Sequence, residues 1–215
     1  MREEPQRIGD RLEGTLRLPD EPVRAIVVIA HPLPTHGGTM RNPVVAAIAR
    51  AVANRGMLAL RFNFRGTGAS GGTWTGGAEE PEDVADAVAH ARALGPALPL
   101  AVCGYSFGAV MTLRWLERGG RAEDVALVGL PLLSVAFAPQ PLPPVPDGAF
   151  VVAAERDQFG PAADVRRAYP DVEVAEVAGA DHFFEGSRDA VGMLVAARFA
   201  RMLVLPAQPE GPRPV

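Results

Sequence analysis

Short apolar runs alternate along the chain with segments in which apolar residues recur at helical spacing. Residues 24–30 (R-A-I-V-V-I-A) have no polar position after the first, which predicts a strand buried on both faces of a sheet. Six further strands are expected, at residues 15–18, 57–62, 99–103, 125–130, 150–154 and 172–177.

The amphipathic segments between these runs predict helices. In the first, Asn42 is a suitable N-cap, Pro43 fits the first helical position and Gly56 ends the apolar stripe. Further helices are expected at about residues 81–94, 107–117, 162–168 and 187–204. Strands that alternate with helices predict an α/β fold, in which a mainly parallel sheet has helices on both faces.

The length of the chain predicts one folded domain. With roughly 150 residues per domain, 215 residues favour one core, which we expect to span residues 1–205. The tail at 206–215 (P-A-Q-P-E-G-P-R-P-V) has nothing to bury and is expected to be disordered.

The charged residues exclude several classes of function. The 21 basic residues against 25 acidic ones give a net charge of −4, which has the wrong sign for a nucleic-acid partner. Every basic residue is an arginine, which excludes P-loop lysines, Schiff bases and Ser-Lys dyads.

Cysteine and histidine are scarce. Cys103 stands alone, and the four histidines lack the spacing of a structural metal site. The first residues are charged and no apolar run approaches about 18 residues, so neither a signal peptide nor a membrane span is expected. We expect a cytoplasmic protein, monomeric or homodimeric, that binds no metal, nucleic acid or membrane.

The most informative segment is 104–108 (G-Y-S-F-G), which follows a predicted strand and directly precedes a predicted helix. This strand-turn-helix context favours a G-x-S-x-G nucleophile elbow, in which Ser106 adopts a strained conformation at a helix amino end. Side chains at Gly104 or Gly108 would crowd so sharp a turn. The alternative is an ordinary serine that caps the helix.

A nucleophilic serine needs a base and an acid, and in enzymes with this kind of elbow they follow the serine along the chain in the order acid, then histidine. Downstream of Ser106 the only histidine is His182, between the last predicted strand and the last helix. The acid is expected after the strand at 150–154, where we favour Asp157 over Glu155 because it lies further past the strand end. Asp181 is adjacent to His182 and is interpreted as a loop-shaping residue.

A negatively charged tetrahedral intermediate needs two amide donors. One is the N–H of Phe107, the residue after the nucleophile, and the other is expected in the loop after the strand at 24–30. Pro32 and Pro34 have no N–H, so Leu33 is the donor between them.

The other histidines have different expected roles. His31 precedes the nucleophile in the chain and is interpreted as a structural residue that braces the loop. His36 is a weaker candidate for a contact with substrate. His90 belongs to a helix face.

A second motif competes with the elbow. Residues 66–71 (G-T-G-A-S-G) match the dinucleotide-binding pattern G-x-G-x-x-G. The next residues, 72–77 (G-T-W-T-G-G), cannot start a helix that would hold a pyrophosphate, and the preceding strand is not the first of the sheet. We therefore interpret these glycines as a loop that passes close to the active site and is braced by Arg65.

Together these segments resemble a small α/β-hydrolase of the lidless bacterial group related to dienelactone hydrolases. The resemblance rests on four stretches, at residues 31–42, 60–68, 104–108 and 179–184. It implies an α/β-hydrolase fold, a triad and an oxyanion hole at the positions argued above: Ser106, Asp157, His182, Leu33 and Phe107. At 154–155 this chain has Ala-Glu where relatives often have Gly-Asp.

The segment at 132–147 stands where larger relatives insert a lid, and it is too short and too rich in proline for a folded cap. An open pocket suits small or extended acyl groups. The sequence therefore predicts a serine hydrolase that cleaves an ester or similar acyl bond of a small molecule through an acyl-enzyme, without a cofactor. The alternatives are a catalytically silent binding or scaffold protein of this fold and a dinucleotide-binding module.

Overall fold

The computed structural model describes residues 2–133 and 142–203. The first half of this part contains β1 (Glu3–Ile8), β2 (Leu12–Arg17), β3 (Ala25–Ala30), η1 (Pro34–His36), α1 (Pro43–Ala53), β4 (Met57–Phe62), α2 (Glu80–Leu94) and β5 (Leu100–Tyr105). The second half contains α3 (Phe107–Glu117), β6 (Asp124–Val128), β7 (Phe150–Ala154), α4 (Ala162–Ala168), β8 (Glu173–Val177), α5 (Arg188–Phe199) and η2 (Ala200–Leu203).

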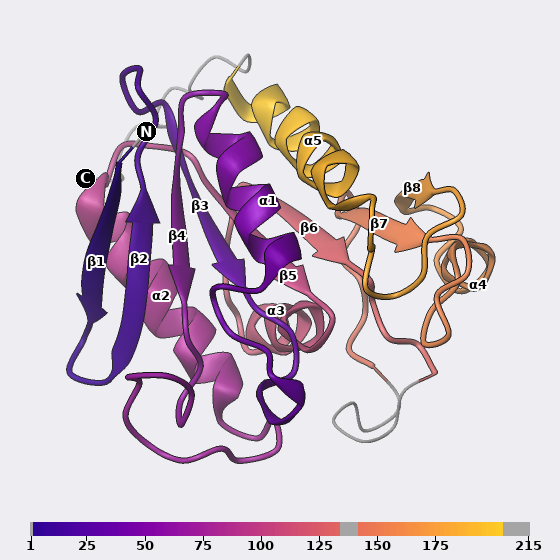
Figure 1. Ribbon diagram of the computed structural model, residues 1–215, viewed down its shortest axis with the longest axis horizontal. Helices are drawn as coiled ribbons and strands as arrows, with labels where there is room; N and C mark the ends of the chain where they lie inside the picture. The colour runs from indigo at the N-terminus through magenta and orange to yellow at the C-terminus, as the bar shows by residue number, and fades with distance from the viewer. Residues whose placement is uncertain (1, 134–141, 204–215) are drawn as a thin grey trace, which may run out of the picture.

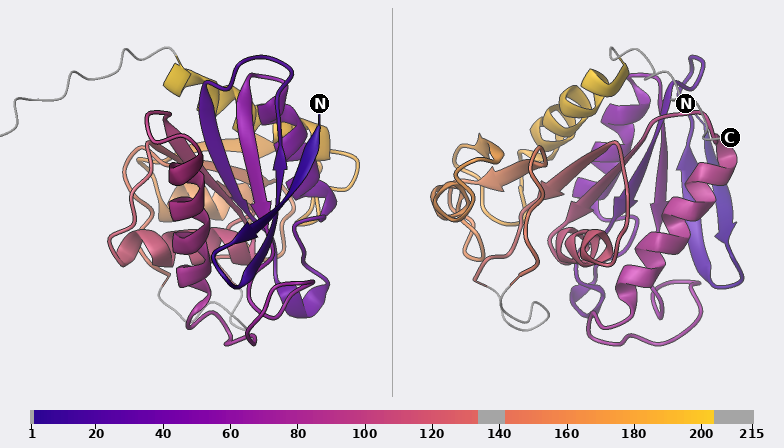
Figure 2. Two further views of the ribbon diagram at one scale, coloured as in Figure 1. Left: turned by 90° about the vertical axis from the view of Figure 1, so that its left-hand side faces the viewer. Right: turned by 180° about the vertical axis from the view of Figure 1, so that it is seen from behind.

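The eight strands form one sheet in the order β1-β2-β4-β3-β5-β6-β7-β8 (Figure 1). The six strands from β4 across to β8 pair in parallel, whereas β2 pairs antiparallel with β4, and β1 with β2. Helices α1 and α5 cover one face, and α2 and α3 cover the other (Figure 2). The predicted α/β architecture with helices on both faces is confirmed.

Several elements have the predicted bounds, among them β4, α3, β7 and α4. The side chain of Asn42 accepts a hydrogen bond from the N–H of Val44 at 2.9 Å, as expected for the N-cap of α1. In β3, Val27 packs under α1 and α5, and Val28 packs under α2 and α3, so the strand is buried on both faces as predicted.

The amino-terminal hairpin departs from the prediction. Strand β1 was not expected, and β2 begins at Leu12 rather than at residue 15. β1 is an edge strand whose one buried residue is Ile8, so it has no apolar run to predict it. It forms because Gly9, with φ +52°, turns the chain back on β2.

Other boundaries differ by a few residues. Strand β5 continues to Tyr105, and β6 ends at Val128, directly before Gly129 with its φ of +54°. The last helix was expected to run to residue 204, but α5 ends at Phe199 and a short 3-10 turn follows.

Two sequence predictions concern segments that fall wholly or partly outside the described residues. The tail at 206–215 lies beyond them, and the expected lid position at 132–147 is described only at 132–133 and 142–147, where no helix occurs. Within the described part of the chain, no helix has both the length and the apolar character that crossing a membrane requires.

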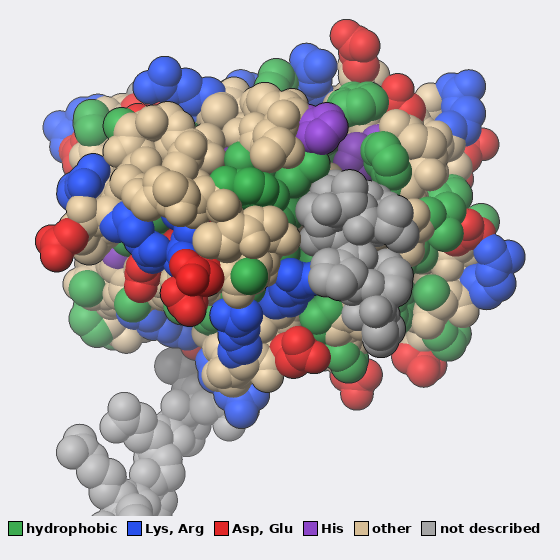
Figure 3. All heavy atoms as spheres, turned by 90° about the horizontal axis from the view of Figure 1, so that it is seen from below, with side chains coloured by type: hydrophobic (Ala, Val, Ile, Leu, Met, Phe, Trp, Pro, Cys, Tyr) green, Lys and Arg blue, Asp and Glu red, His purple; other side chains and the backbone are tan. Residues whose placement is uncertain are grey.

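The central parallel strands end at the lower side of Figure 1, and Figure 3 shows the molecule from that side. Histidine side chains lie there beside hydrophobic ones. Loops that follow parallel strands converge at this end, which is where open α/β sheets bind ligands.

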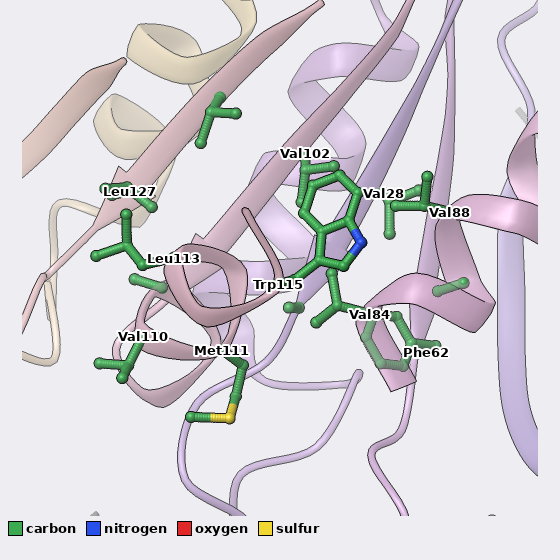
Figure 4. Packing of buried hydrophobic residues seen from close by; sticks show 14 of the residues in the cluster. Val28, Phe62, Val84, Val88, Val102, Val110, Met111, Leu113, Trp115 and Leu127 are labelled. Atoms are coloured by element: carbon green, nitrogen blue, oxygen red, sulfur yellow. The ribbon is translucent and has the colours of Figure 1, made fainter. Parts of the chain in front are cut away.

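Helix α3 is held firmly against the sheet. Figure 4 shows Trp115 of α3 between Val84 and Val88 of α2 and Val102 of the sheet. A Cβ at Gly120 would lie 2.3 Å from the Trp115 indole, so a glycine is needed where the chain leaves α3. This packing fixes the helix whose first residue directly follows Ser106.

Candidate active site

Ser106 occupies a strained turn between β5 and α3. Its φ of 54° and ψ of −115° lie in a region that side-chain-bearing residues rarely adopt. A Cβ at Gly104 would lie 2.3 Å from the carbonyl oxygen of Gly108, and one at Gly108 would lie 2.4 Å from that of Ala30. Glycine at both positions is what lets the strand, the turn and the helix approach so closely.

The side chain of Ser106 does not cap the helix. No cap hydrogen bond forms at the amino end of α3, and Oγ instead lies 2.9 Å from Nε2 of His182. The interpretation of Ser106 as an ordinary capping serine is therefore excluded.

His182 connects Ser106 to a buried carboxylate. Its Nδ1 lies 2.8 Å from Oδ2 of Asp157, which is 1% exposed. The other oxygen, Oδ1, accepts hydrogen bonds from the N–H groups of Phe159 at 2.8 Å and Gly160 at 3.3 Å. These bonds fix the orientation of the carboxylate, so the structure brings Ser106, His182 and Asp157 into one hydrogen-bonded chain.

Glu155 and Asp181 make other contacts. Oε2 of Glu155 accepts a hydrogen bond from the N–H of Gly179 at 2.6 Å, so this side chain supports the loop before His182 rather than its imidazole. Oδ1 of Asp181 accepts from the N–H of Phe183 at 3.0 Å, which is the loop-shaping contact expected for it.

Aromatic side chains surround the imidazole. The ring centroid of Phe159 lies 4.8 Å from that of His182 at an interplanar angle of 82°, and Phe183 lies 5.8 Å away at 85°. The Tyr105 hydroxyl donates to the backbone carbonyl of His182 at 2.8 Å, and burial raises the pKa of this phenol. Tyr105 and Phe159 were not predicted as site residues, although Tyr105 directly precedes Ser106 and Phe159 follows Asp157 by two residues.

The loop between β3 and α1 carries Leu33. The carbonyl of Leu33 accepts from the N–H groups of His36 at 3.1 Å and Gly38 at 3.0 Å, so the loop curls around this residue. Within the described part of the chain, the Leu33 N–H meets no acceptor. Leu33 and Ser106 line the same cavity, and Phe107 is the first residue of α3.

His31 braces this loop, as predicted. It is fully buried, its Nε2 accepts from the N–H of Phe64 at 3.1 Å, and its Nδ1 donates to the carbonyl of Pro32 at 2.6 Å. Burial lowers the pKa of His31 to about 4, despite the opposing effect of the Pro32 carbonyl, so the imidazole is neutral. The far end of the loop is held by Asn63, which accepts from the N–H of Met40 at 2.8 Å.

The remaining histidines lie apart from the hydrogen-bonded chain. His36 lines the cavity, where its contact with substrate stays a prediction. His90 lies on α2, with Nε2 3.2 Å from Oε1 of Gln6.

The glycine-rich loop does not form a dinucleotide site. No helix begins directly after Gly71, because the next helix, α2, starts only at Glu80. Arg65 braces the loop as expected, through ion pairs with Asp83 at 2.9 Å, with Glu82 and with Glu79. Residues 66–71 are not among the described residues that line the cavity, but the same loop reaches the elbow through Trp74, whose ring centroid lies 4.9 Å from that of Phe107.

A cavity of about 290 Å³ opens at Ser106 and His182. Its described lining comes from the Leu33 loop, the serine elbow and the two loops that carry Asp157 and His182. The lining residues are Pro32, Leu33, His36, Gly38, Asn42, Tyr105, Ser106, Phe159, His182 and Phe183.

The fold and the serine elbow define an α/β serine hydrolase. A family model described as serine aminopeptidase, S33, matches residues 21–188, and the chain belongs to this hydrolase family. The resemblance to small lidless α/β-hydrolases is confirmed by solved structures.

Three bacterial structures illustrate the likeness. An α/β serine hydrolase homologue from Coxiella burnetii is 27% identical, with a TM-score of 0.78 over 91% of this chain and 96% of the other. A lidless α/β serine hydrolase from Xanthomonas campestris is 26% identical, with a TM-score of 0.79 over 92% of this chain and 91% of the other. A putative α/β-hydrolase from Agrobacterium tumefaciens is 29% identical, with a TM-score of 0.76 over 94% of this chain and 96% of the other.

Proposed function

We propose that this protein hydrolyses an ester or similar acyl bond of a small molecule, with Ser106 as nucleophile, His182 as general base and Asp157 as the orienting acid. The observation that carries the proposal is the continuous chain of two hydrogen bonds, 2.9 Å from Ser106 to His182 and 2.8 Å from His182 to Asp157. Nucleophile, base and orienting acid within hydrogen-bond reach are the signature of an activated serine.

The reaction follows from this geometry. Nε2 of His182 takes the hydroxyl proton as Oγ of Ser106 attacks the acyl carbon, and Asp157 stabilises the resulting imidazolium. The N–H groups of Leu33 and Phe107 are the proposed donors to the oxyanion. His182 then returns the proton to the departing alcohol, which leaves an acyl group on Ser106. Water, activated by the same imidazole, releases the acid and restores the serine.

The test is the loss of turnover in Ser106→Ala with a short p-nitrophenyl ester. Since the hydrogen bond of the hydroxyl is the one to His182, its loss should change the melting temperature by only a few degrees, while kcat falls by about 10³-fold or more. Ser187→Ala is the matched control, because Ser187 makes no cap hydrogen bond at the start of α5, and it should keep wild-type activity. A Ser106→Ala variant that retains more than about a tenth of kcat would refute the assignment.

A further inference from the structure

The cavity wall has an unusual composition for this chain. Charged residues make up 21% of the sequence, yet the described lining of the cavity contains no Asp, Glu or Arg. The chain has no lysine at all, so arginine and histidine are its only cationic side chains. A charged substrate group would thus meet no fixed counter-charge on the part of the wall that the structure describes.

On the basis of the proposed hydrolysis at Ser106, we propose that the cavity selects uncharged acyl groups and discriminates against acyl groups that carry a carboxylate or an ammonium ion, with Phe183 as a residue that determines this selectivity.

The carboxylate nearest to the reacting atoms is not available to a cation. Asp157 is buried behind His182 and is not part of the lining. One oxygen is bound to His182, and the other accepts two backbone N–H groups. An ammonium group in the cavity would therefore lose water without gaining an ion pair, which carries a large penalty in free energy.

The polar groups of the wall are neutral hydrogen-bonding groups or are already engaged. The Tyr105 hydroxyl donates to the carbonyl of His182. Oδ1 of Asn42 accepts from the N–H of Val44, which leaves the amide NH₂ of Asn42 as a neutral donor. Besides His182, His36 is the one residue of the described lining that has an imidazole. Its effect on the selectivity between neutral and charged esters therefore needs its own control.

The apolar part of the wall favours a neutral acyl chain. Phe159, Leu33 and Pro32 line the cavity, and Phe183 stands at its rim with 58% of its surface exposed. The N–H of Phe183 is held by Asp181, so the ring is anchored at its backbone. An apolar chain that covers this ring is stabilised because apolar surface is removed from water, whereas a carboxylate or ammonium ion loses its hydration there. The volume of about 290 Å³ lies at the small end of ligand pockets.

This selectivity bears on the choice between ester and peptide substrates. A peptide cleaved from its amino end presents an ammonium group next to the scissile bond, and an enzyme that selects such peptides needs an anionic partner there. The described wall offers none, so we expect acyl groups of neutral esters to be preferred.

Three methyl esters of similar size test the proposal at pH 7: methyl butanoate, monomethyl succinate and methyl 2-aminobutanoate. The second carries a carboxylate, and most of the third carries an ammonium group at this pH. We expect kcat/KM for methyl butanoate to exceed that for each charged ester by about tenfold or more. Methanol release gives the same readout for all three.

Variants of Phe183 test its role. Phe183→Arg should raise kcat/KM for monomethyl succinate relative to methyl butanoate by about fivefold or more, and Phe183→Asp should do the same for methyl 2-aminobutanoate. Met193→Asp is the control for Phe183→Asp, because it introduces the same negative charge on α5 at a side chain that is 59% exposed and outside the described cavity lining. It should leave the kcat/KM of each charged ester relative to methyl butanoate unchanged. His36→Gln should leave the discrimination against monomethyl succinate intact.

The possible failures are distinguishable. If the wild-type protein cleaves either charged ester as fast as methyl butanoate, the selectivity proposal is overturned while hydrolysis at Ser106 stands. Ratios that do not respond to Phe183→Arg and Phe183→Asp overturn the role of Phe183. If none of the esters is cleaved and a serine-directed phosphonate does not label Ser106, the proposed function fails and the selectivity falls with it.

Discussion

The hydroxyl of Tyr105 donates a hydrogen bond across 2.8 Å to the backbone carbonyl of His182. Tyr105 is the last residue of β5 and directly precedes Ser106. The strand that carries the proposed nucleophile thus also holds the loop that carries the proposed base. A tyrosine phenol is protonated at neutral pH, and burial raises the pKa of Tyr105 further, so the side chain keeps this donor.

Removal of this hydroxyl should make the His182 loop less rigid, while the aromatic ring at position 105 keeps its packing contacts. A hydrogen bond of this kind contributes about 1 kcal/mol, so we expect Tyr105→Phe to lower kcat by about three- to tenfold and the melting temperature by a few degrees. Steady-state kinetics and thermal unfolding check this. A variant with unchanged kcat would show that the Tyr105 contact does not position His182.

The two acids after β7 should differ sharply. Asp157→Asn should reduce kcat by about 10³- to 10⁴-fold, because an amide at this position favours the wrong tautomer of His182. Glu155→Gln should retain most of the activity, because Glu155 contacts Gly179 and not the imidazole. Kinetics of both variants on one ester decide the assignment, and a severe loss in Glu155→Gln with a mild loss in Asp157→Asn would reverse it.

The shape of the Leu33 loop depends on Gly38. A Cβ there would lie 2.1 Å from the carbonyl oxygen of Pro32 and 2.6 Å from that of Leu33, so Gly38→Ala must displace the proposed oxyanion donor. We expect kcat to fall by about 10²- to 10³-fold. Gly37→Asn is the control, since Gly37 has open space around it and its φ of +79° is tolerated by asparagine. Equal activity in the two variants would argue against Leu33 as a donor.

His31 makes the stability of the fold depend on pH. Its folded pKa of about 4 lies below the ordinary value of 6.5, so between these values the unfolded chain binds a proton that the folded chain does not. The contribution of His31 to the free energy of unfolding is therefore complete above about pH 6.5. As the pH falls to about 4, roughly 3 kcal/mol of that contribution is lost progressively.

Urea unfolding of the wild type and of His31→Gln at pH 7, 5.5 and 4.5 measures this effect. The free energy of unfolding should fall more steeply with decreasing pH in the wild type, since the other titrating groups are common to both proteins. Parallel curves would mean that His31 is not the buried neutral imidazole described above.

The central part of the fold could be anticipated because its causes are local. Ser106, Asp157 and His182 are far apart in the sequence, and they could be anticipated because nucleophile, acid and histidine follow one another in a characteristic order. The elbow glycines, the buried strand before Ser106 and the uniqueness of His182 downstream are all visible in the sequence. Strand β1 was missed because its pairing with β2, rather than any apolar pattern of its own, creates it. Local patterns do not record such a partnership.

The surroundings of the site were harder to anticipate for a related reason. The contact between Tyr105 and His182 joins residues 77 positions apart, and the ring of Phe159 reaches His182 from another loop. The N–H of Gly71 donates to the carbonyl of Arg11 in the amino-terminal hairpin, a contact that the sequence pattern does not show.

The most direct test of the account is to locate the serine that becomes covalently modified. The chain has four serines, Ser70, Ser106, Ser134 and Ser187, and Ser106 alone lies within hydrogen-bond distance of His182 among those that the structure describes. The wild-type protein should react stoichiometrically with a fluorophosphonate, lose its esterase activity in step, and carry the adduct on the peptide that contains Ser106. His182→Ala should react far more slowly under the same conditions. An adduct on another serine, or an active enzyme whose peptides remain unmodified, would contradict the account.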